Sequence, residues 1–454
     1  MKKIQIDEEF YGREKISRIL LKIAPPVMLA QLIQSLYNIA DSFFVGKYSD
    51  DSLTALSVIY PIQLIIVALA VGTGVGVNTY MARKYAQHDE ESARKAAGTG
   101  TVLAVLSWAV FTVISLLIMR PYVLTSAKSE AAINDAVTYG IIVCAGSLFS
   151  FLEGNWTKVH QAHGNMTLPM IAQVSGAVTN IILDPLLIFG FAFIPAMGVA
   201  GAAIATVAGQ AVAAIITGIS GCKKPPKISE MPHYAARIYH YGYSSIIMQT
   251  LFTVYIVALN VILASFSDEA VTVLGLYYKL QSFFFIPLFG LQTCIVPVLS
   301  YNFTCSRTDR CRQVMRDTLI ISCLFMLIGI VVFVFFPDFA IDIFSKNPKV
   351  HDIGRKAFPI IGSSFICAAF SLTFPVFFQA IGYGKTSMLL SCTRQLLCLI
   401  PIFYLFSLVG LDYCWLSFPI SETIAGSIGL ILYIIMIKKQ KKRLNIDTIS
   451  TGVL

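Results

Sequence analysis

The sequence predicts an all-α polytopic membrane protein with about twelve transmembrane helices, arranged as two lobes of six helices each. Hydrophobic residues make up 56% of the 454 residues and charged residues only 13%, and the mean hydropathy is +0.73. Apolar runs of about 20 residues or more recur along the chain, and each can cross a hydrocarbon layer of roughly 30 Å as a helix. A repeat of the first half in the second half predicts the two lobes.

Each expected span is a long apolar run that polar or charged residues bound on both sides. The expected spans cover residues 23–45, 53–82, 96–119, 132–159, 167–190, 197–219, 240–265, 271–302, 314–336, 357–381, 386–409 and 414–437. Ten-residue segments of alternating hydrophobicity, the pattern typical of a membrane barrel, are absent. The pattern therefore favours a helical bundle.

The two halves align with each other at a constant offset. DDSLTALSVIYPIQ at 50–63 lies over DEAVTVLGLYYKLQ at 268–281, and QAHGNMT at 161–167 lies over QAIGYGKT at 379–386 after one extra residue. Six spans is an even number, so both halves enter the membrane in the same sense, as a parallel repeat about a pseudo-two-fold axis along the membrane normal.

This repeat divides the chain into four expected parts. They are an N-lobe at 1–219, a cytoplasmic linker at 220–239, a C-lobe at 240–437 and a basic cytoplasmic tail at 438–454.

The basic residues are distributed unequally between the two sides of the membrane. With the N-terminus inside, 25 of the 34 Lys and Arg residues fall in cytoplasmic segments, 7 fall in outer connections, and Lys279 and Arg394 lie within spans. An excess of Lys and Arg marks cytoplasmic segments, so both termini are expected in the cytoplasm. The net charge of +9 then reflects topology, and no nucleic-acid partner is expected.

An ionisable residue inside a span costs about 2.5–3.5 kcal/mol at a helix centre, and six such residues are candidates for a role there. They are Asp41, Glu153, Asp184, Lys279, Arg394 and Glu422. Arg394 and Glu153 lie near cytoplasmic helix ends, and snorkelling to the interface explains both.

Lys279 and Glu422 share a depth of about 12 Å below the outer surface, so they are predicted to pair. In the alternative, Lys279 snorkels outward and Glu422 lines the substrate cavity.

Asp41 and Asp184 are candidates for a cation site. Both lie about 7–9 Å inside the outer boundary by the helical rise, Tyr139 lies at a similar depth, and Asn180 shares the helical face of Asp184 four residues later. Carboxylate and amide oxygens suit a hard cation such as sodium, and a close carboxylate pair suits a proton. Alternatively, Tyr139 and Asn180 only hold the carboxylate by hydrogen bonds to join helices.

The first span also carries a polar stripe, at Gln31, Gln34, Asn38 and Asp41. The residues expected to line a substrate cavity are Gln34, Asn38, Gln249, Asn260, Lys279 and Glu422. The second lobe does not copy the cation site, because the repeat places Leu259 opposite Asp41 and Phe403 near the equivalent of Asp184.

Several motifs together resemble the multidrug and toxic compound extrusion (MATE) family, in its MepA-type or DinF-like branch. They are APPVMLAQ at 24–31, YNIADSFFVG at 37–46, the glycine run VGTGVGVN at 71–78, NIILDPLLIFG at 180–190 and GVAGAAIAT at 198–206. The resemblance implies export of amphipathic or cationic drugs in antiport with sodium or protons. It also implies that Asp41, Tyr139, Asn180 and Asp184 form a first-lobe cation network, with Ala202 at the position where relatives often carry a threonine.

The resemblance gives no catalytic motif, so an enzyme is not expected, and sodium or a proton is the only cofactor expected. The protein is expected to act as a monomer in the plasma membrane of a prokaryotic cell, with small drugs and the lipid bilayer as partners. The alternative function is a flippase of lipid-linked oligosaccharide.

Overall fold

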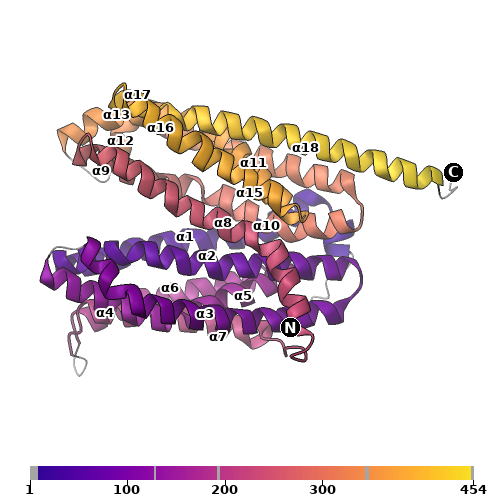
Figure 1. Ribbon diagram of the computed structural model, residues 1–454, viewed down its shortest axis with the longest axis horizontal. Helices are drawn as coiled ribbons and strands as arrows, with labels where there is room; N and C mark the ends of the chain where they lie inside the picture. The colour runs from indigo at the N-terminus through magenta and orange to yellow at the C-terminus, as the bar shows by residue number, and fades with distance from the viewer. Residues whose placement is uncertain (1–8, 127–128, 192–194, 343–346, 451–454) are drawn as a thin grey trace. The chain divides into compact units, whose positions relative to one another are not determined.

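The computed structural model describes residues 9–126, 129–191, 195–342 and 347–450, and within these residues the chain is helical with no β-strand. It divides into two compact units (Figure 1). Unit 1 comprises Pro25–Gln249, and unit 2 comprises the described residues before Pro25 together with those from Thr250 onward. Two helices, α1 (Ile16–Tyr48) and α8 (Met231–Ala264), cross the boundary between the units.

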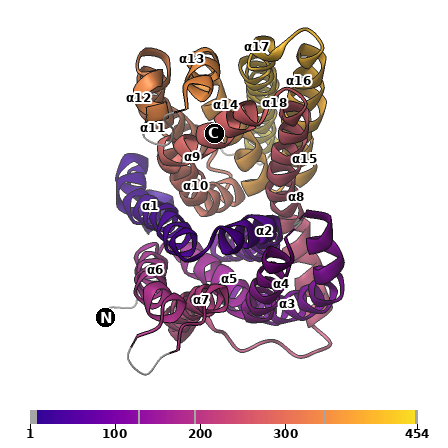
Figure 2. The ribbon, with the colours of Figure 1, turned by 90° about the vertical axis from the view of Figure 1, so that its left-hand side faces the viewer.

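Unit 1 is a bundle whose helices lie side by side, as the views along and across the helices show (Figures 1 and 2). Besides parts of α1 and α8, it contains α2 (Asp50–Ala86), α3 (Glu90–Ser126), α4 (Glu130–Gly146), α5 (Leu148–Ala162), α6 (Thr167–Ile188) and α7 (Val199–Gly221). Its core gathers apolar side chains from α2, α3, α4 and α7, among them Ile59, Met119 and Tyr139.

Unit 2 contains the remaining helices, and aromatic side chains form much of its core. Its elements are the π-helix η1 (Glu9–Arg13), α9 (Asp268–Phe284), α10 (Ile286–Thr304), α11 (Thr308–Phe335), α12 (Pro337–Asp342), α13 (Pro348–Gly362), α14 (Phe365–Ala380), α15 (Gly384–Cys392), the π-helix η2 (Thr393–Leu399), α16 (Ile400–Ser407), α17 (Leu411–Cys414) and α18 (Ser417–Ser450). Phe333 packs against Phe358 and Phe365 at ring-centroid distances of 4.9 and 5.0 Å.

The internal repeat is visible in where the helices begin. One constant offset along the chain separates the starts of α2 and α9, of α3 and α11, of α4 and α13, and of α7 and α18. It is the offset at which the two halves of the sequence align. The same bend also recurs: α4 and α5 meet at 43°, and α13 and α14 at 55°. The two units therefore share one helical plan.

Serine side chains explain both bends, which hydropathy did not predict for the spans 132–159 and 357–381. The Ser147 hydroxyl donates to the carbonyl of Cys144 at 2.7 Å, and those of Ser363 and Ser364 donate to Ile360 and Ile361 at 2.6 Å each. Such bonds to the preceding turn compete with the helical ladder and bend helices.

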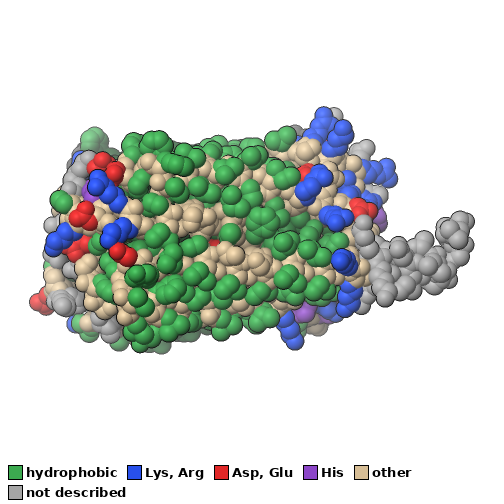
Figure 3. Space-filling model, turned by 90° about the horizontal axis from the view of Figure 1, so that it is seen from above, with side chains coloured by type: hydrophobic (Ala, Val, Ile, Leu, Met, Phe, Trp, Pro, Cys, Tyr) green, Lys and Arg blue, Asp and Glu red, His purple; other side chains and the backbone are tan. Residues whose placement is uncertain are grey.

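The helices suit a membrane. Ten described helices are long and apolar enough to cross a bilayer, or up to twelve if each bent pair is one span. In Figure 3, hydrophobic side chains fill a broad band, while Lys, Arg, Asp and Glu gather at its two ends. This agrees with the expected fold class of about twelve spans.

Candidate functional site

The candidate cation site is built on a close contact between α6 and α7. Residues spaced by four place Gly176, Asn180 and Asp184 on one face of α6. A Cβ added to Gly176 would lie 2.6 Å from the carbonyl oxygen of Gly209, and one added to Gly209 would lie 2.6 Å from that of Gly176. Small residues thus let the two backbones touch, which brings the polar residues of α6 against α7.

Asn180 is the centre of the polar contacts at this helix pair. Its amide nitrogen donates to Asp184 Oδ1 at 3.2 Å and lies 3.5 Å from the hydroxyl of Thr206 on α7. Asn180 and Asp184 are 2% and 0% exposed. An ionised carboxylate only accepts hydrogen bonds, so Asn180 donates to Asp184 through its nitrogen. The side-chain oxygen of Asn180 is left without a hydrogen-bond donor.

Tyr139 on α4 joins this cluster to α2. Its hydroxyl accepts a hydrogen bond from Gln63 Nε2 at 3.2 Å, and it also lies within hydrogen-bonding reach of Thr206. Tyr139 is fully buried. Four helices of unit 1 therefore contribute polar groups to one buried cluster.

Asp41 brings a second carboxylate to the cluster from α1. Its side chain is buried, and its charge acts on both Asp184 and Tyr139. The structure thus brings together all four residues that the sequence predicts for cation coupling.

Three buried oxygens of this cluster have no hydrogen-bond donor. They are Oδ1 of Asp41, Oδ1 of Asn180 and Oδ2 of Asp184. A buried acceptor without a donor is costly, and two neighbouring carboxylates repel each other. Carboxylate and amide oxygens are ligands that suit sodium, and a proton on one carboxylate would relieve the repulsion, so the chemistry of these oxygens fits either ion.

The expectation that the site lacks a threonine is wrong. Ala202 is fully buried in the apolar core of unit 1, while Thr206, one turn later on α7, contacts Asn180. The motif GVAGAAIAT contains both residues one helical turn apart, and its sequence does not show which of them faces Asn180. Gln63 was also missed, although its helical position near the depth of Tyr139 could have suggested it.

Unit 2 has an apolar core where the repeat places this site. At the offset of the repeat, with its one extra residue included, the counterparts of Asp41, Tyr139, Asn180 and Asp184 are Leu259, Ala357, Leu399 and Phe403. All four counterparts are buried in the hydrophobic core of unit 2. At these positions unit 2 therefore carries apolar side chains, and the candidate cation site described above lies in unit 1.

The prediction that Lys279 pairs with Glu422 is wrong. Glu422 on α18 pairs with Arg394 on η2, with Nη2 and Oε1 2.7 Å apart, and it also accepts a hydrogen bond from Ser371. Lys279 is exposed. Arg394 is buried, so the expectation that it snorkels to the interface is wrong as well.

The cavity-lining role of the other four residues stays a prediction. Within unit 1, Gln34 and Gln249 are half-buried and Asn38 is exposed; within unit 2, Asn260 is half-buried.

A family model settles what kind of protein carries this site. The MatE model matches residues 26–186 and again 244–405. The chain belongs to the MatE family. The starts of the two matches are separated by the offset of the internal repeat, and their ends by one residue more, which reproduces the repeat and its one extra residue. Members of the MatE family are transporters, so this chain is a multi-pass membrane transporter and not an enzyme.

Curated relatives and solved structures match the MatE chain over nearly its whole length. It is 24% identical to the multidrug export protein MepA of Staphylococcus haemolyticus, over 98% of both chains. It is 23% identical to an FAD transporter of Shewanella oneidensis, over 90% of this chain and 93% of that protein.

Among structures, an outward-facing multidrug resistance MATE family transporter aligns with a TM-score of 0.89. That structure is 21% identical, and the alignment covers 97% of this chain and 99% of that one. At this identity the match supports the fold.

Proposed function

We propose that this MatE protein is a secondary active multidrug exporter, which moves amphipathic or cationic organic compounds in antiport with sodium or protons. The observation that carries the proposal is the set of three donorless buried oxygens on Asp41, Asn180 and Asp184. The MepA relatives are named as multidrug exporters, which supports drugs as the exported class.

A coupling ion at this site has a direct physical effect on α1. Without a cation, the carboxylates of Asp41 on α1 and Asp184 on α6 repel each other. A cation between them would reverse that force and draw the C-terminal part of α1 toward α6. Occupancy thus biases the position of α1, which gives ion binding a way to change the conformation of the transporter.

The membrane potential supplies part of the driving force. A cation that moves inward gains about 2.3 kcal/mol per charge for each 100 mV of potential. Sodium would bind the carboxylate and amide oxygens, whereas a proton would need only the carboxylate pair. We therefore propose either sodium or a proton as the coupling ion.

The excess of Lys and Arg in alternate connections supports a plasma-membrane protein of a prokaryotic cell, with both termini in the cytoplasm. We propose that it acts as a monomer. The flippase alternative finds no support among the reported relatives, which are named for drug export or FAD transport.

Transport by the purified protein in liposomes tests the proposal. Efflux of a cationic dye is measured under a sodium gradient at equal pH on both sides, and separately under a pH gradient without sodium. Asp41→Asn and Asp184→Asn are each expected to abolish the gradient dependence.

Asp135→Asn is the matched control, because Asp135 lies on α4 of the same unit and accepts a hydrogen bond from Ser52 at 2.6 Å, outside the cluster. Full gradient dependence in both site variants would refute the assignment of the coupling site.

A further inference from the structure

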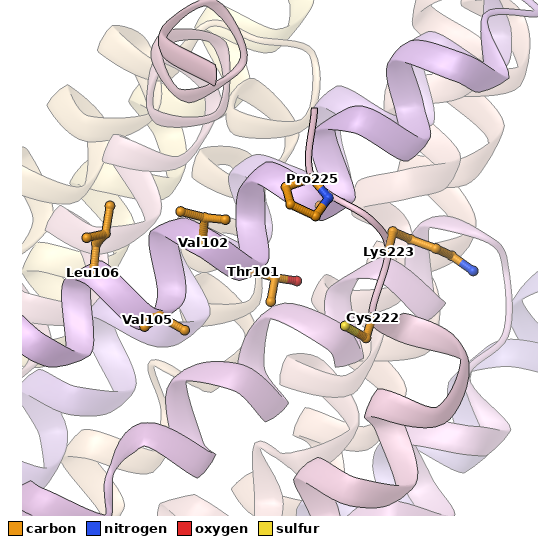
Figure 4. A pocket seen from close by; sticks show the side chains of 8 residues that line it. Thr101, Val102, Val105, Leu106, Cys222, Lys223 and Pro225 are labelled. Atoms are coloured by element: carbon orange, nitrogen blue, oxygen red, sulfur yellow. The ribbon is translucent and has the colours of Figure 1, made fainter. Parts of the chain in front are cut away.

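A groove opens on the surface of unit 1 between α3 and the segment that follows α7 (Figure 4). Its volume is about 280 Å³. It is lined by Gly98, Thr101, Val102, Val105 and Leu106 of α3 and by Cys222, Lys223 and Pro225. The hydroxyl of Thr101 is already used, because it accepts from Trp156 Nε1 at 3.0 Å and donates to the Ala97 carbonyl at 3.3 Å. The groove is therefore apolar.

The wall opposite α3 is held in place at two points. A Cβ on Gly98 would lie 2.7 Å from the Cα of Pro225, so only glycine lets this segment rest on α3. Farther along the chain, Glu230 forms an ion pair with Lys95 of α3 at 3.0 Å. The groove is thus a built feature of unit 1.

The positively charged side chain of Lys223 lies at one end of the groove. Lys223 is half-buried, and no carboxylate among the described residues forms an ion pair with it. Its amine lies at the end remote from Val105 and Leu106 (Figure 4). Lys224 and Lys227 are exposed beside it, while the nearby carboxylate of Glu230 is already paired with Lys95.

At its other end the groove continues into an exposed apolar track along α3. Leu106, Val110, Val113 and Leu117 are 56%, 60%, 59% and 75% exposed, and their spacing of three and four residues places them on one helical face. The part of this track from Gly98 to Val110 is about 18 Å long along the helix axis, close to the depth of one leaflet of a hydrocarbon core of roughly 30 Å. An elongated apolar ligand with an anionic end would match this layout.

We propose that this groove binds one anionic phospholipid, with an acyl chain in the groove and along the α3 track and the phosphate on Lys223. The apolar lining accounts for the chain, and Lys223 accounts for the anionic headgroup, since basic pockets at the ends of membrane helices recognise such headgroups. The bound lipid would fasten residues 222–225 to α3. The proposal depends on the membrane setting of the chain and is independent of any coupling ion or drug.

Cys222 reports directly on occupancy because it lines the groove and is exposed. The protein is placed in nanodiscs of phosphatidylcholine alone or with phosphatidylglycerol, and alkylation by neutral N-ethylmaleimide is followed by peptide mass spectrometry. Cys305, which is partly exposed and lies in unit 2, serves as the internal control for general effects of the charged surface. Both leaflets have the same composition, so the orientation of the protein does not matter.

We expect phosphatidylglycerol to slow the alkylation of Cys222 about fivefold, the effect of one lysine near an anionic lipid, and to leave Cys305 unchanged. Lys223→Gln is expected to remove this difference, and Lys227→Gln, outside the groove lining, to retain it. Val102→Phe, which fills the groove, should also remove it.

Equal protection by phosphatidylcholine, or an undiminished phosphatidylglycerol effect in Lys223→Gln, would overturn the proposal. Protection by soluble glycerol phosphate in phosphatidylcholine discs would also overturn it, because it would indicate a phosphate site rather than a lipid site.

Discussion

Arg394 and Glu422 form a buried two-pronged ion pair between η2 and α18. Arg394 Nε lies 3.0 and 2.9 Å from the two carboxylate oxygens of Glu422, and Nη2 lies 2.7 Å from one of them. The exposed fractions of the two side chains are 7% and 6%. The planar guanidinium fork matches the carboxylate in a way that a lysine cannot.

Replacing only one partner of this pair should destabilise the protein more than replacing both. Glu422→Gln or Arg394→Met alone leaves a buried charge without its partner, which costs about 3–5 kcal/mol, whereas replacing both partners costs much less. Thermal unfolding of the purified protein in detergent should therefore show a large loss of melting temperature in each single variant and a partial recovery in the double variant.

Strictly additive losses would contradict this coupling. Lys279→Met serves as the comparison, because Lys279 is exposed and lies outside the pair. Its combination with Glu422→Gln is expected to give no recovery.

Thr206, and not Ala202, should affect ion coupling. Thr206→Val keeps the shape of the side chain but removes the hydroxyl near Asn180 and Tyr139. The loss of one buried hydrogen bond is worth about 1 kcal/mol, so the coupling-ion concentration for half-maximal efflux should change about fivefold. Ala202→Ser should leave this concentration unchanged. A larger effect of Ala202→Ser than of Thr206→Val would indicate that position 202 belongs to the ion site instead.

The contact between α6 and α7 should not tolerate a methyl group. In Gly209→Ala the new Cβ would lie 2.6 Å from the Gly176 carbonyl oxygen, and overpacking of this kind costs about 1–3 kcal/mol. Melting temperature and ion-dependent efflux should both fall, because this contact positions Asn180.

Gly275→Ala is the matched control for that substitution. No atom lies within 4 Å of a Cβ at Gly275, and alanine favours a helix over glycine. Its melting temperature should be unchanged or slightly higher, and an equal loss in both variants would argue against a specific contact.

Asp89 should stabilise the start of α3 in a pH-dependent way. It accepts hydrogen bonds from the backbone N–H of Ser92 at 3.0 Å and from Lys84 Nζ at 3.0 Å. These bonds, chiefly those from Ser92, lower the pKa of Asp89 to about 2. Because the folded pKa lies below the unfolded value, the stabilisation is present above about pH 4 and is lost as the pH falls toward 2.

Asp89→Ala is therefore expected to cost about 1 kcal/mol at pH 7, as for other helix caps, and nearly nothing near pH 2. Asp89→Asn should keep most of the stability at pH 7, since asparagine also caps helices. Unfolding in detergent at several pH values measures both, and a constant cost of Asp89→Ala down to pH 2 would count against the carboxylate.

The sequence alone predicts the spans and the repeat, and it groups the four residues of the candidate cation site by depth. Membrane insertion depends on the summed hydrophobicity of a contiguous stretch, so hydropathy along the chain reveals the spans directly. Asp41, Tyr139, Asn180 and Asp184 could be grouped because depth follows from counting residues along a helix, which rises by a fixed amount at each residue. The repeat needs only the comparison of letters between the two halves.

The tertiary structure decided which side chains meet across helices. Lys279 and Glu422 share a depth, but η2 packs directly against α18, and this brings Arg394 to Glu422 instead. Thr206 replaces Ala202 in the cluster because the touching backbones of α6 and α7 set the register between them. Depth is a property of one helix, whereas a contact depends on the rotation, neighbours and packing of two, and these are fixed only when the bundle is assembled.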